Sequence, residues 1–271
     1  MSRPIWFLDT LKSLFAGRYW MAKATRIPPI GKLVEYFLFD KDDIVYLPKN
    51  QVISLHKEIE LPDDMVLPSR VVEHFVEQSS HRWLMNRCMC RDAAGCKDYP
   101  IELGCLFLGE ATLNINPKLG RFVSKEEAID HLRRCREAGL VHMIGRNKLD
   151  TFWMGVQPGH NLMTICNCCP CCCLFGVLPH LNADIGRKVT KMPGVSVSVN
   201  ENCDGCGLCV DAGCFVDAIR MENGRAHIND DCRGCGHCAE VCPQGAIELR
   251  VDDPRFVENT IQRLSQAVDV S

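Results

Sequence analysis

The chain has 271 residues, 46% of them hydrophobic and 24% charged, which suits a folded protein with one or two substantial cores. A net charge of −3 gives no general attraction to nucleic acid. The apolar runs are too short for a membrane-spanning segment, and the first residues lack the pattern of a secretory signal. We therefore expect a cytoplasmic protein without a transmembrane segment.

The chain contains 19 cysteines, far more than an ordinary protein of this length. An odd number of cysteines without an export signal argues against a disulfide framework and favours metal binding. The cysteines form three groups, at residues 88–105, 166–173 and 203–242. Cys135 stands outside these groups, on the apolar face of a predicted helix, and we expect it to be a core thiol.

The first 80 residues contain no cysteine and are expected to form a helical docking region. Residues 5–20 have apolar side chains at helical spacing and are rich in Trp, Phe and Tyr. One interpretation is a helix that docks on its own protein or on a partner. The alternative is an amphipathic helix at a membrane surface, since basic residues flank the segment.

A second helix is predicted to begin at Ser124, because Ser124 and Glu127 have the spacing of a capping box. Gly139 marks its expected end. The residues that follow predict a strand at 140–144, a turn at 146–150 and a second strand at 151–156. A helix and β-hairpin in this order resemble the end of a winged helix, although no basic recognition helix supports DNA binding.

The third cysteine group contains two related runs, CDGCGLCVDAGC at 203–214 and CRGCGHCAEVCP at 232–243. The second has the spacing of an iron–sulfur run in bacterial ferredoxins, and the first has one extra residue before Cys214. The fourth cysteine of such a run binds the cluster of the other run. One 4Fe–4S cluster is therefore assigned to Cys203, Cys206, Cys209 and Cys242, and the other to Cys232, Cys235, Cys238 and Cys214.

On these motifs, residues 195–250 resemble the two-cluster ferredoxin domain of bacteria. The resemblance implies a βαββαβ fold and one-electron transfer at low potential. Alternating valines at 195–199 predict a strand, Asn223-Gly224 predicts a hairpin turn, and residues 253–268 predict a final helix. Residues 195–271 hold 13 Asp and Glu, six Arg and no Lys, so this end of the chain suits a basic redox partner.

The first two groups supply ten further thiols, too dense to be left free in a reducing compartment. They are Cys88, Cys90, Cys96, Cys105, Cys166, Cys168, Cys169, Cys171, Cys172 and Cys173. We expect the two groups to fold together and bind one or two more iron–sulfur clusters. The alternatives are a cluster on the four cysteines of the first group alone, zinc, or redox-active thiols.

The segments Cys88–Arg91, Gly104–Gly109, Gly139–His142 and Ile165–Cys169 make residues 80–250 similar to uncharacterised cysteine-rich iron–sulfur proteins of anaerobic bacteria. This resemblance implies an anaerobic redox protein and names no substrate. His142, His160 and His180 lie near the second group, and each is expected to be an ordinary core or surface histidine. The sequence has no GxGxxG or GxxxxGK motif, so a nucleotide cofactor would belong to a partner.

These observations predict an α+β fold with four parts: a helical region (1–80), a cysteine-rich metal-binding region (81–194), a two-cluster ferredoxin domain (195–251) and a C-terminal helix (252–271). The expected function is low-potential electron relay between the ferredoxin module and a middle cluster site, as an oxidoreductase subunit that contacts a redox partner or a larger complex. Peripheral membrane contact is compatible with the first helix. The alternatives are an enzyme with a substrate-binding cluster and a zinc-stabilised adapter.

Overall fold

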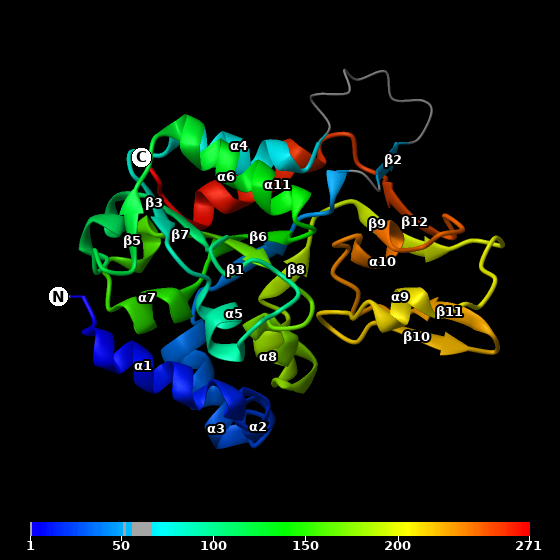
Figure 1. Ribbon diagram of the computed structural model, residues 1–271, viewed down its shortest axis with the longest axis horizontal. Helices are drawn as coiled ribbons and strands as arrows, with labels where there is room; N and C mark the ends of the chain where they lie inside the picture. The colour runs from blue at the N-terminus through cyan, green and yellow to red at the C-terminus, as the bar shows by residue number, and fades with distance from the viewer. Residues whose placement is uncertain (1, 51–52, 56–66) are drawn as a thin grey trace.

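A seven-stranded sheet with helices on both faces forms the larger part of the computed structural model, and a smaller part with short strands lies beside it (Figure 1). The structure describes residues 2–50, 53–55 and 67–271. The predicted α+β class with a helical N-terminal region is confirmed. No helix among these residues is both long and apolar enough to cross a bilayer.

Most of residues 5–39 are helical. The elements are α1 (Ile5–Leu14), a 3-10 helix (Phe15–Gly17), α2 (Arg18–Ala24), α3 (Pro28–Val34) and a π-helical turn (Glu35–Phe39). Pro28 stands in the first turn of α3, where its missing N–H removes no helical hydrogen bond. The predicted helix at 5–20 is therefore interrupted at residues 15–17.

The large sheet has the strand order β5-β3-β4-β7-β6-β1-β8. Its strands are β1 (Asp43–Tyr46), β3 (Arg82–Met85), β4 (Leu106–Leu108), β5 (Gly120–Phe122), β6 (Val141–Arg146), β7 (Met163–Cys168) and β8 (Val189–Lys191). All neighbours are antiparallel except β1 and β8. The central strands are buried on both faces, so they carry nearly continuous apolar residues.

Different helices cover the two faces of this sheet (Figure 1). One face is covered by α4 (Ser69–Gln78), α6 (Lys125–Glu137) and α11 (Phe256–Ala267), which share one apolar core with the strands. The N-terminal helices, α5 (Met89–Ala94), α7 (Lys148–Met154) and α8 (Ala183–Gly186) lie on the other. The C-terminal helix α11 therefore packs on the larger part of the molecule, although most of the residues it contacts there lie much earlier in the sequence.

The smaller part contains a three-stranded sheet in the order β2-β12-β9 and a two-stranded hairpin. Its elements are β2 (Ile53–Leu55), β9 (Val195–Val199), α9 (Leu208–Asp211), β10 (Ile219–Glu222), β11 (Arg225–Ile228), α10 (His237–Glu240) and β12 (Ile247–Val251). The predicted strand at 195–199 and the hairpin at Asn223-Gly224 are confirmed. Asn223 and Gly224 have φ angles of 49° and 77°, the left-handed conformation that such a turn requires.

The start and end of α6 agree with the sequence, but the hairpin predicted after it is wrong. Glu127 donates its backbone N–H to the Ser124 side chain at 3.2 Å, and Gly139 follows the helix with φ 78°. Residues 148–154 then form α7 instead of a turn and a strand. Residues 141–146 pair with β1 and β7, so the winged-helix resemblance does not hold. Trp153 and Met154 are buried on this helix, and so short an apolar run does not distinguish a helix from a strand.

Candidate metal centres

The two ferredoxin-like runs fold as tight loops whose glycines allow the thiols to converge. Gly205, Gly207, Gly234 and Gly236 have φ angles of 79°, 78°, 64° and 77°. Backbone amides donate to the sulfur atoms: Ala226 N lies 3.4 Å from Cys203 Sγ, and Ala246 N lies 3.3 Å from Cys242 Sγ. The amides of Ala226 and Gly205 lower the pKa of Cys203, so the backbone here favours the thiolate that binds metal.

The thiols of these loops surround two small cavities, each with cysteines from both runs. One is lined by Cys203, Cys206, Cys209 and Cys242, and the other by Cys214, Cys232, Cys235 and Cys238. The structure thus brings together the same two sets of four that the crosswise assignment proposes. Four thiols from two loops also match the ligand number of a 4Fe–4S cluster, so the residues fit this cofactor.

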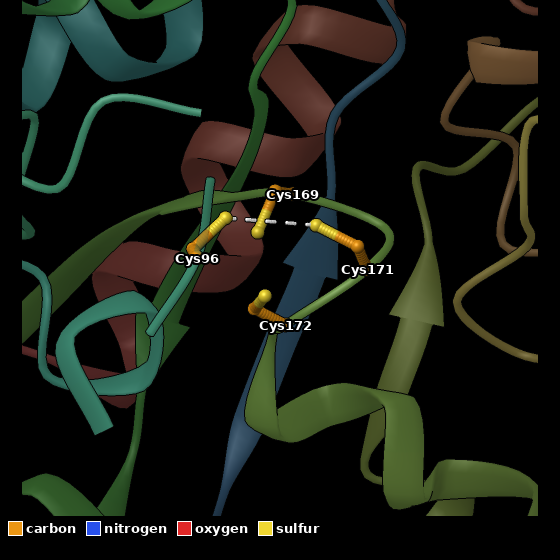
Figure 2. A group of neighbouring side chains, drawn as sticks. All are labelled: Cys96, Cys169, Cys171 and Cys172. Carbon is orange, nitrogen blue, oxygen red and sulfur yellow. Dashed lines mark hydrogen bonds between the residues drawn. The ribbon is translucent and has the colours of Figure 1, made fainter. Parts of the chain in front are cut away.

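The ten middle thiols separate into two groups, each drawing on both cysteine segments. Four of them, which we call the quartet, have sulfur atoms within 4.8 Å of one another: Cys96, Cys169, Cys171 and Cys172 (Figure 2). Cys96 follows α5, and the other three follow β7, so the quartet joins residues 73 or more positions apart. The Sγ atoms of Cys96 and Cys171 are 3.8 Å apart.

The other six thiols, which we call the thiol row, are neighbours in space, each close enough to the next to perturb its pKa. Their order is Cys90, Cys88, Cys105, Cys166, Cys168 and Cys173. Cys166 and Cys168 are two residues apart on β7 and therefore point to the same face of the sheet. Cys168 and Cys173 have their sulfur atoms 3.1 Å apart. Cys96 joins Cys169, Cys171 and Cys172 in the quartet, whereas the other three cysteines of its segment belong to the thiol row.

A buried cation lies between the quartet and the thiol row. Arg91 is 1% exposed and donates to the carbonyl oxygens of Asn167, at 2.7 Å, and Leu103, while its Nε has no partner among the described residues. No described carboxylate forms an ion pair with it. Burial alone would lower the pKa of Arg91, but the sulfur atoms of Cys88, Cys169 and Cys105 raise it overall when they carry negative charge.

The burial of Arg91 indicates which kind of ligand the surrounding thiols can bind. An isolated buried guanidinium is costly unless negative charge lies close to it. Among the described residues, the anionic candidates beside Arg91 are the thiols of Cys88, Cys169 and Cys105, and thiolates persist in a buried site when metal binds them. The donor set of both middle groups therefore fits a thiolate-ligated metal centre. Arg91 ends the Cys88–Arg91 segment, but no pattern in the sequence predicts that its side chain is buried beside the thiols.

A buried tyrosine lies between the thiol row and the ferredoxin-like part. Tyr46, at the end of β1, is fully buried, and its hydroxyl has no hydrogen-bond partner among the described residues. It lines the same cavity as Cys214 and Cys235, and its ring centroid is 5.6 Å from that of Phe215. Burial raises the pKa of Tyr46, and the nearby Cys173 of the thiol row raises it further. Sequence reasoning missed Tyr46 because β1 is remote from every cysteine in the chain.

The histidines of the middle region do not belong to either thiol group that the structure describes. His142 is buried, accepts or donates a 2.8 Å hydrogen bond with Asn167, and has its pKa lowered to about 3 by burial. His180 stacks edge-on against Tyr19, and His160 is exposed. Cys135 is fully buried, and burial raises its pKa to about 12, as expected for a core thiol.

Comparison with known proteins supports the C-terminal part alone. A family model described as a 4Fe-4S dicluster domain matches residues 202–246. No curated protein and no solved structure matches the chain. The chain therefore carries a ferredoxin-like iron–sulfur domain near its C-terminus, and this domain together with the many cysteines supports a role in iron–sulfur electron transfer.

Proposed function

We propose that this protein relays electrons between the ferredoxin-like domain and metal centres on the middle cysteines, as a subunit of an anaerobic, cytoplasmic redox complex. The observation that carries the proposal is a shared packed core. Cys168 and Cys173 of the thiol row lie in one apolar cluster with Tyr46, Phe215, Cys214 and Cys235. The two sets of thiols are thus linked through close-packed protein interior and not through solvent.

Each set of residues has a distinct part in this proposal. The eight ferredoxin-like cysteines would hold two 4Fe–4S clusters, crosswise as described above, and the quartet supplies enough thiols for another. Bound clusters would supply one-electron redox chemistry. The surrounding protein excludes water, holds the thiols in place, and offsets their negative charge with Arg91.

The charge distribution supports a protein partner at the ferredoxin-like end. Residues 195–271 carry a net charge of −7 from 13 acidic and six basic side chains, while the whole chain carries −3. An acidic surface attracts a basic docking patch and speeds encounter at low ionic strength. We propose that electrons enter or leave here through a redox partner.

The quartet also fits a second function, that of a zinc-stabilised adapter. Four thiols within 4.8 Å of one another suit a tetrahedral zinc site as well as a cluster. In an adapter, the middle centre would stabilise the fold and take no electrons. Arg91 does not distinguish the two functions, because zinc-bound thiolates are anionic too.

The relay is tested by following reduction of the full-length, anaerobically purified protein with a rapidly mixed low-potential dye. The Cys235→Ala variant removes a ligand from the ferredoxin-like site that Tyr46 borders. We expect reduction of the middle centres to slow by about tenfold or more, a barrier change of about 1.4 kcal/mol. Cys206→Ala, in the other site, is the control. Equal rates of middle reduction in wild type and Cys235→Ala, or zinc in place of iron in the quartet, would contradict the relay.

A further inference from the structure

A large apolar cavity lies between the N-terminal helices and the thiol row. Its volume is about 530 Å³, and its walls are almost entirely apolar. All six cysteines of the thiol row line it, together with Arg91 and residues of α1, α2 and α3. The proposed function uses the thiols of this cavity but does not explain its size or its apolar walls.

The cavities at the two ferredoxin-like sites are far smaller. The cavities at their two sets of four thiols have volumes of about 10 and 30 Å³. The cavity beside the thiol row is more than ten times larger than either. Its volume falls instead in the range of sites for small organic molecules, about 300–1,000 Å³.

The outer wall of the cavity is a single layer of helices with apolar side chains on both sides. Leu14, Trp20, Met21 and Ile30 line the cavity, whereas Trp6, Ile27 and Leu33 of the same segment do not line it and are exposed by 68%, 52% and 59%. Large apolar residues are rarely exposed in such number on one surface unless they contact lipid or a partner. The first 34 residues contain six Lys and Arg but only one acidic residue, a charge that suits an anionic membrane.

We propose that the cavity binds an uncharged quinone-class molecule, which enters from a bilayer through the layer formed by α1, α2 and α3. This inference rests on the proposed function, since electrons must reach the thiol row. An apolar site disfavours any ligand that gains net charge on reduction. A quinone avoids that cost: two electrons and two protons convert both carbonyls to hydroxyls, and the hydroquinone is also neutral. The two electrons come from the redox partner proposed at the ferredoxin-like end, and the two protons come from water.

The test compares two tryptophan substitutions at neighbouring positions of α3. Val34 lines the cavity and is half-buried, whereas Leu33 is 59% exposed and does not line it. Val34→Trp should fill part of the cavity, and Leu33→Trp should leave it unchanged. Binding of menadione to the oxidised full-length protein is measured by equilibrium dialysis. We expect Val34→Trp to weaken binding by about tenfold or more, equivalent to about 1.4 kcal/mol, and Leu33→Trp to bind as wild type does.

Two further measurements separate this inference from the proposed function. Iron content and reduction of the clusters by dithionite should be the same in all three proteins, which also shows that they fold. Anthraquinone-disulfonate, a charged quinone, should not bind. Absence of menadione binding to wild type, or equal binding by Val34→Trp, overturns the site even when the clusters are intact.

A second arm identifies the source of the ligand. The reduced protein is mixed with phosphatidylcholine–phosphatidylglycerol vesicles that contain a long-chain quinone. Reduction of that quinone, lost in Val34→Trp, supports delivery from the bilayer. Reduction of dissolved menadione alone overturns entry through the membrane.

Discussion

The two cysteine-rich regions of this protein assemble their thiols by different routes. In the ferredoxin-like part, three of every four thiols come from one short loop, and each set surrounds a cavity of about 10 or 30 Å³. In the middle region, the thiols come from α5 and the residues on either side of it, from Cys105 just before β4, from β7 and from the segment after β7, and the sheet brings them together. A local motif can specify the first arrangement, whereas only the complete fold can specify the second.

The largest expected effect comes from removing one thiol of the quartet. Cys169→Ala should lower the iron content of the anaerobically purified protein by about four atoms per chain, because one cluster loses a ligand. Cys135→Ala is the matched control, since Cys135 is a buried thiol outside both groups. Equal iron content in Cys169→Ala and Cys135→Ala would show that the quartet holds no iron.

The crosswise arrangement of the ferredoxin-like part predicts an effect of similar kind. Cys242→Ala should damage the cluster of Cys203, Cys206 and Cys209, although Cys242 belongs to the other run. The electron paramagnetic resonance spectrum of reduced Cys242→Ala should then match that of Cys206→Ala. A spectrum that matches Cys235→Ala instead would mean that each loop ligates its own cluster.

A buried carboxylic acid, Asp42, lies directly before β1. Burial raises the pKa of Asp42 to about 7 from an ordinary value of 3.8, while the backbone N–H of Lys148 donates to it at 2.7 Å. As the pH rises, the Asp42 carboxyl loses its proton at a lower pH in the unfolded chain than in the folded protein. The free energy of unfolding should therefore fall as the pH rises from about 4 to about 7. The free energy involved is at most about 4 kcal/mol.

Asp42→Asn should remove that pH dependence and stabilise the protein at about pH 8 but not at about pH 4. The midpoint of thermal unfolding of the holoprotein is the measurement. Asp43→Asn is the control, because Asp43 forms an ion pair with the partly exposed Arg263, and its loss costs about 1 kcal/mol or less. An Asp42→Asn variant with the wild-type pH dependence would disprove the role of this carboxyl.

The smallest effect is expected at the boundary between the two regions. The Tyr46 hydroxyl is buried without a described partner beside Cys214 and Cys235, so it is placed to donate to a ligated sulfur atom. Tyr46→Phe should lower the potential of that cluster by roughly 20–60 mV, in line with the loss of one hydrogen bond to a charged group. A redox titration measures the shift. Tyr36→Phe, at an exposed tyrosine, should cause none.

Much of the ferredoxin-like part could be predicted from the sequence because its determinants are local. The spacing of the cysteine runs, the Asn223-Gly224 turn and the alternating valines at 195–199 each act within a few residues. The capped helix at Ser124 was predictable for the same reason.

The middle region was less predictable because its thiols meet through sheet pairing. Residues 106–108 of β4 pair with 163–165 of β7, which brings Cys105 to Cys166 across 61 positions of the chain. The division of the ten cysteines into quartet and thiol row follows from this register. The positions of Tyr46 and Arg91 beside the thiols arise only in the folded protein. A separate error was the prediction of a strand where α7 lies, because its apolar run is too short to distinguish the two.

The most direct test of the central claim, that the middle thiols hold redox-active iron in addition to the ferredoxin-like domain, is the metal and sulfide content of the anaerobically purified full-length protein. Two ferredoxin clusters account for about eight iron atoms, and a quartet cluster raises the expected number to about twelve or more, with matching sulfide and no zinc. A content of about eight iron atoms, with or without zinc, would contradict the claim and leave the middle region without a part in electron transfer.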